Sequence, residues 1–170
     1  MNDPKNIAEE FSKNLERFRD LLENCTAEER NWKPSPSSWC LLELLGHLYD
    51  EECFDFRARI QHLFEHPNTA PPPIDPQGWV ETHEYLKQDY GIAWKRFAKA
   101  REESLLWLQK NEEGPWQNEF NHPHFGRMSA ALFLTNWLAH DYFHLRQIYK
   151  IKALFLEHHR GHSINYAGGL

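Results

Sequence analysis

Hydrophobic residues recur along this chain at intervals of three and four, the spacing of one face of an α-helix. No segment alternates with the period of two that is typical of a half-buried strand. A first helix is expected to start at Asp3 and Pro4, because aspartate is a favourable N-cap and proline fits the first helical position. Its apolar stripe consists of Ile7, Phe11, Leu15, Phe18 and Leu22.

A second helix is expected from the serine pair at 37–38 to about His66, because Pro67 cannot continue it. The buried positions of this helix are expected to be Leu41, Leu44, Leu45, Leu48 and Phe56. Before it, Thr26 and Glu29 have the spacing of a capping box, which predicts one short helical turn.

A proline-rich loop, residues 68–78, precedes a long third helix that is expected over residues 79–110. The inward stripe of this helix is expected to be Leu86, Tyr90, Ala93, Phe97, Ala100, Ser104 and Leu108. Trp94 and Trp107 lie off this stripe. Because large aromatic side chains outside a core often mark an interface, we expect a homodimer. Burial of the two tryptophans under the loop is the alternative.

Residues 118–127 are expected to form an irregular loop, after which Ser129 caps a fourth helix that reaches about Leu156. Four amphipathic helices joined by loops predict an all-α four-helix bundle over residues 1–156. The tail, residues 157–170, is polar and glycine-rich, so we expect it to be loosely held.

Composition and charge narrow the class of protein. A chain of 170 residues is the size of one domain. A net charge of -6 and the lack of a Lys/Arg-rich tract argue against a nucleic-acid partner. No apolar run is long enough for a membrane span, and the N-terminal segment has no apolar core of a signal peptide. We expect a cytoplasmic protein with three reduced thiols, which are Cys25, Cys40 and Cys53.

Histidine is unusually frequent, with eleven residues in the chain. His140 and His144 stand one helical turn apart, on the face that also carries Phe133, Trp137, Ile148 and Ile151. On the second helix, His47 lies among leucines. Imidazoles on apolar faces are costly unless their nitrogens are satisfied. Three imidazoles suit zinc, nickel or ferrous iron and leave a position free for water or substrate. Hydrogen-bonded core histidines without a metal are the alternative.

Two segments carry a family resemblance. SSWCLLELLGHLYDEE (37–52) and WLAHDYFHLRQI (137–148) resemble the helix-two and helix-four signatures of the DinB-like metal-binding superfamily, and HPHFGRMS (122–129) is similar to the loop before helix four. Order and spacing agree over about residues 5–150. The resemblance implies an unusual four-helix bundle in which a divalent metal is held by His47, His140 and His144.

Several polar residues near these histidines have two interpretations. Glu51, one turn beyond His47, either faces the metal as a base or outer-shell acceptor or is a solvated helix carboxylate, and we favour the solvated state. Tyr49 is a second candidate for the open metal position. Asn136 either orients an imidazole or lies on the surface.

The remaining candidates are assigned structural or minor roles. Glu52 is expected to pair with Arg57 or another cation, and Asp141 and Arg146 to be structural ion-pair partners. Five side chains are not expected to be ligands, because they lie in the tail or at the wrong spacing: Cys40, Cys53, His158, His159 and His162. His122 and His124 lie in a loop between helices, where they either line a site entrance or are exposed, and we favour exposure.

Three neutral ligands leave the charge of a divalent ion uncompensated, so such an ion activates either a bound water or a bound thiol. The resembled superfamily includes bacterial thiol S-transferases and a thiol-dependent isomerase. The resemblance therefore implies transfer of a low-molecular-weight thiol, the co-substrate, onto a small electrophile. A metal-dependent hydrolase is the alternative. A non-catalytic metal-binding or small-ligand-binding stress-response protein is a third possibility.

Overall fold

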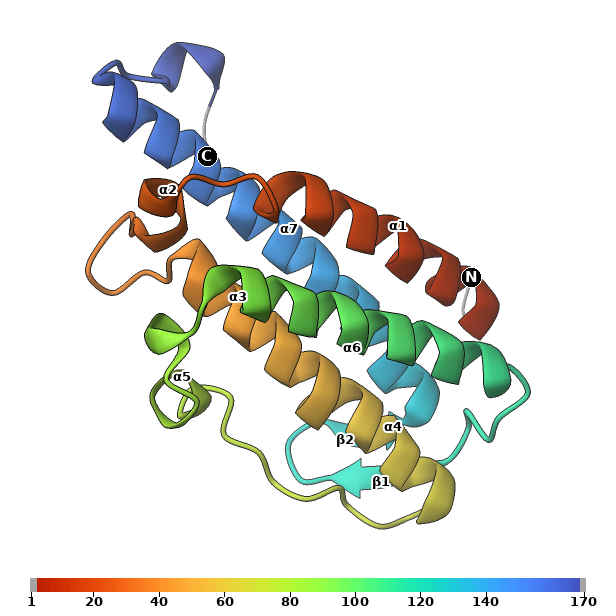
Figure 1. Cartoon of the computed structure of the whole chain (residues 1–170). Helices are drawn as coiled ribbons and strands as arrows, with labels where there is room; N and C mark the ends of the chain where they lie inside the picture. The colour runs from red at the N-terminus through yellow and green to blue at the C-terminus, as the bar shows by residue number, and fades with distance from the viewer. Residues whose placement is uncertain (1–2, 169–170) are drawn as a thin grey trace.

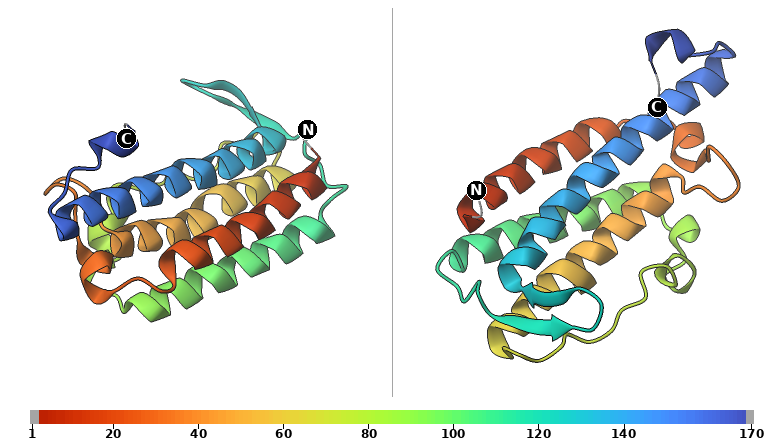
Figure 2. Two further views of the ribbon diagram at one scale, coloured as in Figure 1. Left: turned by 90° about the horizontal axis from the view of Figure 1, so that it is seen from above. Right: turned by 180° about the vertical axis from the view of Figure 1, so that it is seen from behind.

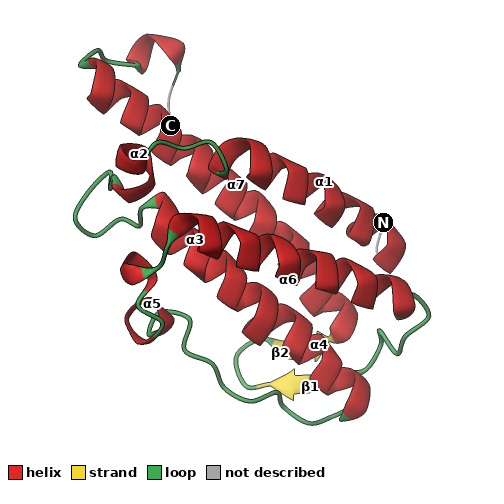
Figure 3. Ribbon diagram, in the orientation of Figure 1, coloured by secondary structure: helices red, strands yellow, loops and turns green. Residues whose placement is uncertain are grey.

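Four long helical units lie side by side in the computed structural model, which describes residues 3–168 (Figure 1). Their bounds are α1 (Pro4–Leu22), α3 (Leu41–Asp50) continued by the π-helical turn η1 (Glu51–Asp55) and α4 (Phe56–Glu65), α6 (Tyr90–Lys110) and α7 (Ala130–Arg160). The shorter elements are α2 (Ala27–Asn31), α5 (Trp79–Thr82), and the 3-10 turns η2 (Tyr85–Lys87) and η3 (Asn165–Ala167). Figure 3 shows how little of the chain between the helices is strand.

The order of the helices around the bundle differs from their order in the chain. α1 packs against α6 and α7, and the α3–α4 unit also packs against α6 and α7. The α3–α4 unit and α6 run in the same direction, so the chain between them returns along the side of the bundle (Figure 1). α7 therefore lies beside the α3–α4 unit, and this neighbourhood brings two distant segments of the chain together (Figure 2).

α1 follows the sequence pattern closely. Asp3 caps it by accepting a hydrogen bond from the backbone amide of Lys5, as its N-cap position predicts. All five residues of the expected stripe are buried. The stripe therefore faces the core that α1 shares with α6 and α7.

The second helix begins later than expected, at Leu41. Cys40 is its N-cap residue, and the Glu43 carboxylate accepts a hydrogen bond from the Cys40 amide at 2.9 Å. The residues before it, 37–40, form turns and extended chain. Midway along the helix, the wider π-helical turn places the neighbours Glu51 and Glu52 both in the interior.

The expectation of one continuous third helix over 79–110 was wrong at its beginning. Glu84 has a φ of 48°, which breaks the helical path, and α6 starts only at Tyr90, where the side chain of Asp89 caps it. Leu86 belongs to the preceding turn and is 54% exposed instead of buried. Tyr85 is buried in its place, against Gly46, where an added Cβ would lie 2.6 Å from the ring.

The loop expected over 118–127 is instead largely a β-hairpin. Strand β1 (Glu119–His122) pairs antiparallel with β2 (Gly126–Ser129), and Phe120 on β1 stacks on Phe133 of α7. Gly126 adopts a φ of 69° after the turn, a value that favours glycine. The pattern was missed because each strand has only four residues.

α7 continues one turn beyond the expected end and stops at Arg160, before Gly161 with a φ of 66°.

Trp94 was expected to lie off the core, and this was wrong: it is buried beside Phe97. Trp107 packs against Phe64 and Trp116. The argument for a homodimer therefore loses one of its two residues, and the dimer remains a prediction. None of the helices in the described part of the chain is long and apolar enough to cross a membrane.

Candidate metal centre

Three histidine side chains from two helices meet at one point in the groove between α3 and α7. The Nε2 atom of His47 lies 3.2 Å from that of His140 and 3.1 Å from that of His144. The Nε2 atoms of His140 and His144 are 2.9 Å apart. The structure therefore brings together the three residues that the sequence singled out.

Helix geometry explains this convergence. His140 and His144 are one turn apart on α7, between the buried residues Trp137 and Ile148 of the same face. His47 sits on α3, where Leu44 and Leu48 fix the helix in the core cluster shared with Ile148. The packing of apolar residues thus determines where the three imidazoles point.

The donor chemistry of the three rings fits a divalent cation. A neutral imidazole carries one N–H, so three Nε2 atoms in mutual contact cannot all find hydrogen-bond donors and acceptors among themselves. Burial lowers the pKa of His47 to about 3 and that of His140 to about 2, so both rings are neutral at pH 7. For metal–nitrogen bonds of ~2.0–2.1 Å, a shared ion requires the nitrogens to be roughly 3 Å apart.

Neighbouring side chains orient two of the rings. The Nδ1 atom of His144 lies 2.9 Å from Oε1 of Gln147, and donation from Nδ1 to that oxygen leaves Nε2 free as a ligand. Nδ1 of His47 is buried without a hydrogen-bond partner and lies 3.7 Å from Oε1 of Glu51. Trp39 packs on the ring of His47, with a centroid distance of 4.8 Å.

Glu51 is buried, so the expectation of a solvated carboxylate was wrong. Its burial raises the pKa of the carboxyl group to about 8, and the negative charge of Asp55 acts in the same direction. The cation Arg59 opposes this shift. Glu51 therefore carries a proton near neutral pH beside a candidate ligand, and it is the carboxyl group that the structure places within 4 Å of the cluster's His47.

A buried ion-pair cluster lies directly behind the histidines. Arg101 of α6 bonds Glu52 of η1 with its Nε, at 2.9 Å, and Asp141 of α7 with both terminal nitrogens. Glu52 was expected to pair with Arg57 or another cation, and this cation is Arg101. Asp141 has the ion-pair role that was expected of it. Asp141 also accepts a hydrogen bond from the side-chain amide of Asn14 on α1.

Other sequence candidates lie away from the histidines. Asn136 is exposed and donates to the carbonyl of Leu132, so it orients no imidazole. Arg146 was expected to form an ion pair, but it is exposed and, among residues 3–168, no carboxylate lies within 4 Å of it. The ring of Tyr49 lies under the guanidinium of Arg96 on the side of α3 that meets α6, which makes it a poor candidate for the metal position.

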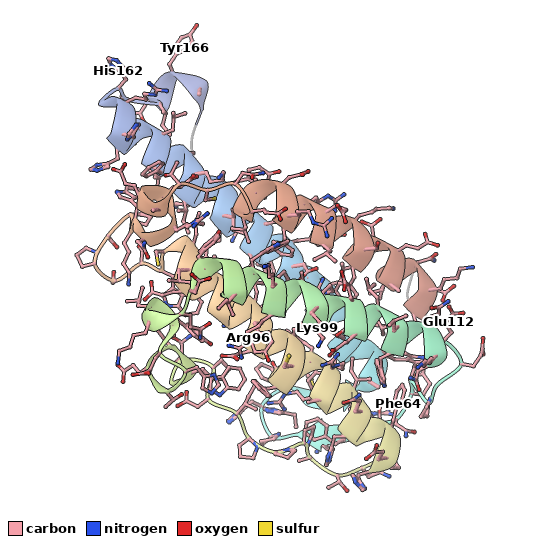
Figure 4. The ribbon with its side chains drawn as sticks, in the orientation of Figure 1. Phe64, Arg96, Lys99, Glu112, His162 and Tyr166 are labelled. Carbon is pink, nitrogen blue, oxygen red and sulfur yellow. The ribbon has the colours of Figure 1, made fainter. Side chains whose placement is uncertain are left out.

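The loop and tail histidines lie outside the cluster. His122 on β1 accepts hydrogen bonds from the backbone amides of His124 and Phe125, and His124 is exposed. His162 projects from the C-terminal end of the chain, away from the bundle (Figure 4). His158 and His159 are exposed on the last turn of α7. The thiols of Cys40 and Cys53 are not part of the cluster either, and burial raises the pKa of each.

Two contacts of the histidines were missed at the level of sequence. Gln147 follows His144 by three residues, which places both on one helical face, so this signal was present in the chain. Trp39 lies within the quoted signature 37–52, but its contact with His47 was not predictable from helical spacing, because it precedes α3 in non-helical chain.

A further polar group was also missed. Asp50 is buried and accepts hydrogen bonds from the Tyr85 hydroxyl and from Nδ1 of His83 at 2.6 Å. His83 and Tyr85 lie in the segment that was misassigned to a continuous helix, so their proximity to Asp50 was not foreseeable. This group ties the segment before α6 to α3.

A profile of the DinB superfamily matches residues 10–148. The chain belongs to the DinB superfamily. The matched residues contain all three histidines of the cluster, and the family resemblance of the two helical signatures is thereby confirmed. No curated protein sequence matches this DinB-superfamily chain significantly.

Among solved structures, YfiT from Bacillus subtilis is similar in fold, with a TM-score of 0.75 over 94% of this chain and 89% of that chain. The sequence identity is 14%. YfiT is described as a probable metal-dependent hydrolase with an unusual four-helix bundle topology. At this identity the likeness establishes the shared four-helix fold. This DinB-superfamily protein is thus a four-helix bundle with a three-histidine cluster suited to a metal ion.

Proposed function

We propose that this protein is a divalent-metal-dependent hydrolase that acts on a small molecule at His47, His140 and His144. The observation that carries the proposal is the convergence of three neutral Nε2 atoms within 3.2 Å of one another. A divalent ion bound there lowers the pKa of a water or thiol at its free position toward ~7. Zinc, nickel and ferrous iron all suit three imidazole ligands.

The residues around the histidines have distinct roles in this proposal. Gln147 keeps the Nε2 atom of His144 unprotonated by accepting from Nδ1. The Arg101 cluster holds α7 in register with α6 and η1, so His140 and His144 stay opposite His47. Glu51 carries a proton near neutral pH and lies 3.7 Å from Nδ1 of His47, so its role in this proposal is to give that proton to the leaving group.

Hydrolysis is favoured over thiol transfer by Glu51. A hydrolase needs a group that gives a proton to the leaving group, and a buried, protonated carboxyl beside a ligand is suited to that role. The description of YfiT as a probable metal-dependent hydrolase agrees with this choice.

Thiol transfer is the second candidate, and the neutrality of the ligand set favours it. Three imidazoles contribute no negative charge, so a divalent ion keeps its full attraction for a thiolate. In this reaction a low-molecular-weight thiol takes the place of water and attacks a small electrophile.

The two reactions are separated by one assay series on metal-loaded protein. Ester and amide substrates are tested without thiol, and small electrophiles are tested with bacillithiol, mycothiol or glutathione. The proposal expects metal-dependent hydrolysis that His144→Ala abolishes and that His162→Ala, a change in an exposed tail histidine, leaves intact. Conjugation that requires a thiol supports the second candidate. Ligand binding without turnover in either series contradicts both and indicates a binding protein.

A further inference from the structure

A pocket of about 440 Å³ lies beside the histidines, between α7 and the chain segment that leads into α3. One wall is formed by Gln147, Lys150, Ile151 and Leu154, which belong to the two turns of α7 that follow His144. The opposite wall includes Ser38 and Trp39. The pocket therefore continues the groove in which the histidines lie.

Two residues that line the pocket also contact histidines of the cluster. Trp39 lines the pocket and packs its ring on His47 at a centroid distance of 4.8 Å. Gln147 lines the pocket and contacts Nδ1 of His144 at 2.9 Å. A molecule in the pocket thus touches the same side chains that orient the candidate ligands.

The pocket differs in charge from the rest of the protein. The chain has a net charge of -6, yet no carboxylate is among the described residues that line the pocket. Lys150 is the charged residue among them, and within residues 3–168 no carboxylate lies within 4 Å of its ammonium group. The other walls are serine and glutamine side chains and the apolar surfaces of Trp39, Ile151 and Leu154. Lys150 is exposed, and a cation without a carboxylate partner at the edge of a partly apolar pocket suits an organic anion.

We propose that this pocket binds the carboxylate end of the substrate, with Lys150 as its counter-ion, and so selects small carboxylic acids that carry a reactive group at the other end. Six residues of α7 separate His144 from Lys150, a rise of about 9 Å along the helix axis. An extended chain of roughly six carbons covers about 6 Å, and the flexible four-carbon stem of Lys150 can cover the rest. The assignment of the reactive end rests on the proposed function, whereas the binding of the carboxylate does not.

The binding test uses the metal-free protein, so it does not depend on catalysis. Hexanoate and the uncharged hexanamide have the same length and differ in charge. We expect hexanoate to bind about fivefold or more tightly than hexanamide by titration calorimetry, because only the former pairs with Lys150. NMR signals of the Trp39 indole and the Gln147 side-chain amide are expected to shift during the titration.

Three variants locate the charge effect. Lys150→Gln is expected to abolish the preference for hexanoate and Lys150→Arg to retain it. Arg146→Gln, which removes a positive charge from the same helix outside the pocket, is expected to leave it unchanged. Equal binding of the two probes by the unmodified protein overturns the proposal. An equal loss of the preference for hexanoate in Lys150→Gln and Arg146→Gln also overturns it, because that result indicates attraction by general surface charge.

Assays with the metal-loaded protein then show whether the hydrolysed substrate or the thiol carries the carboxylate. The first matched pair is a carboxylated and a neutral ester, assayed without thiol. The second pair is 6-mercaptohexanoate and 6-mercaptohexanol, each assayed with an electrophile. In the pair that is turned over, Lys150→Gln is expected to raise KM for the carboxylated member with little change in kcat, and to leave the neutral member unaffected. A KM that rises equally for both members contradicts the assigned role of Lys150. If neither pair reacts, the proposed function fails while the hexanoate result still decides the binding proposal.

Discussion

Arg101 donates two hydrogen bonds, of 2.6 and 2.8 Å, to Asp141, the residue that directly follows His140. Both side chains are almost completely buried, as is Glu52, the second carboxylate that Arg101 bonds. Burial lowers the pKa of the Arg101 guanidinium, but Asp141 and Glu52 together outweigh it and raise that pKa above its already high value, so Arg101 remains charged. These buried ion pairs therefore fix the part of α7 that carries His140 and His144 relative to α6 and η1.

Replacing Arg101 by methionine is expected to destabilise the protein strongly, by about 3–5 kcal/mol, because it leaves two carboxylates buried without a cation. Urea denaturation of the metal-free protein measures the loss. Arg96→Met serves as the control, since Arg96 is exposed on the same helix, and it is expected to cost less than about 1 kcal/mol. Equal stability of the two variants contradicts this account of the cluster.

Gly46→Ala is expected to destabilise the protein by about 1–3 kcal/mol, because the new methyl group would overlap the Tyr85 ring, 2.6 Å away. Gly91→Ala is the matched control. It lies on α6, where an added Cβ is 3.4 Å from the Asp89 carboxylate, and alanine is a better helix former than glycine. We expect this control to be neutral or stabilising in thermal denaturation. A reversed order of the two variants contradicts the packing described for Tyr85.

The sequence was sufficient to predict the parts of the fold that rest on regular apolar spacing. The stripe of α1 is continuous, and Asp3 and Ser129 cap their helices as expected. The third helix was misplaced because the backbone of Glu84 adopts a positive φ, which its residue type does not announce. The hairpin was missed because its pairing depends on contacts between strands too short to show alternation.

The same limits apply to the site. The histidine pair was identifiable from its spacing, and His47 was added by its apolar surroundings and by the resemblance. The burial of Glu51 was not predictable from the sequence, because the π-helical turn changes which side of the helix Glu51 occupies. Trp39 and the pocket depend on how the chain before α3 folds back toward α7, which no periodicity records.

The stability of the metal-free protein is expected to depend on pH with a maximum near about pH 6.5. His47 and His140 have folded pKa values of about 3 and about 2, below the value of the unfolded chain. The unfolded chain therefore binds more protons below pH ~6.5, and stability falls as the pH falls toward 3. Glu51, whose folded pKa is raised to about 8, acts in the opposite sense, and its stabilising contribution is lost as the pH rises to 8.

Urea denaturation of chelator-treated protein across this pH range tests both effects. Glu51→Gln is expected to remove the decline between pH 6.5 and 8 and to keep the acid decline. A pH profile that is flat below 6.5 in the unmodified protein would mean that the histidines are not buried in the neutral form.

Gln147→Leu is expected to weaken metal binding about 10–100-fold, because it removes the acceptor that fixes the ring of His144. Gln147→Glu keeps an acceptor at the same position and is expected to retain affinity. Competition titrations with a chelating indicator measure both. Equal affinities in all three proteins would show that the contact with Gln147 does not orient the imidazole.

The central claim is that His47, His140 and His144 hold one divalent ion, and metal titration of tag-free protein tests it most directly. We expect one zinc, nickel or ferrous ion per chain, with X-ray absorption showing three histidine nitrogens at ~2.0–2.2 Å. Each of the three alanine variants is expected to lose tight binding while keeping its helical content, and His162→Ala is expected to bind as the unmodified protein does. Tight binding that survives in all three variants, or no binding by the unmodified protein, would contradict the account.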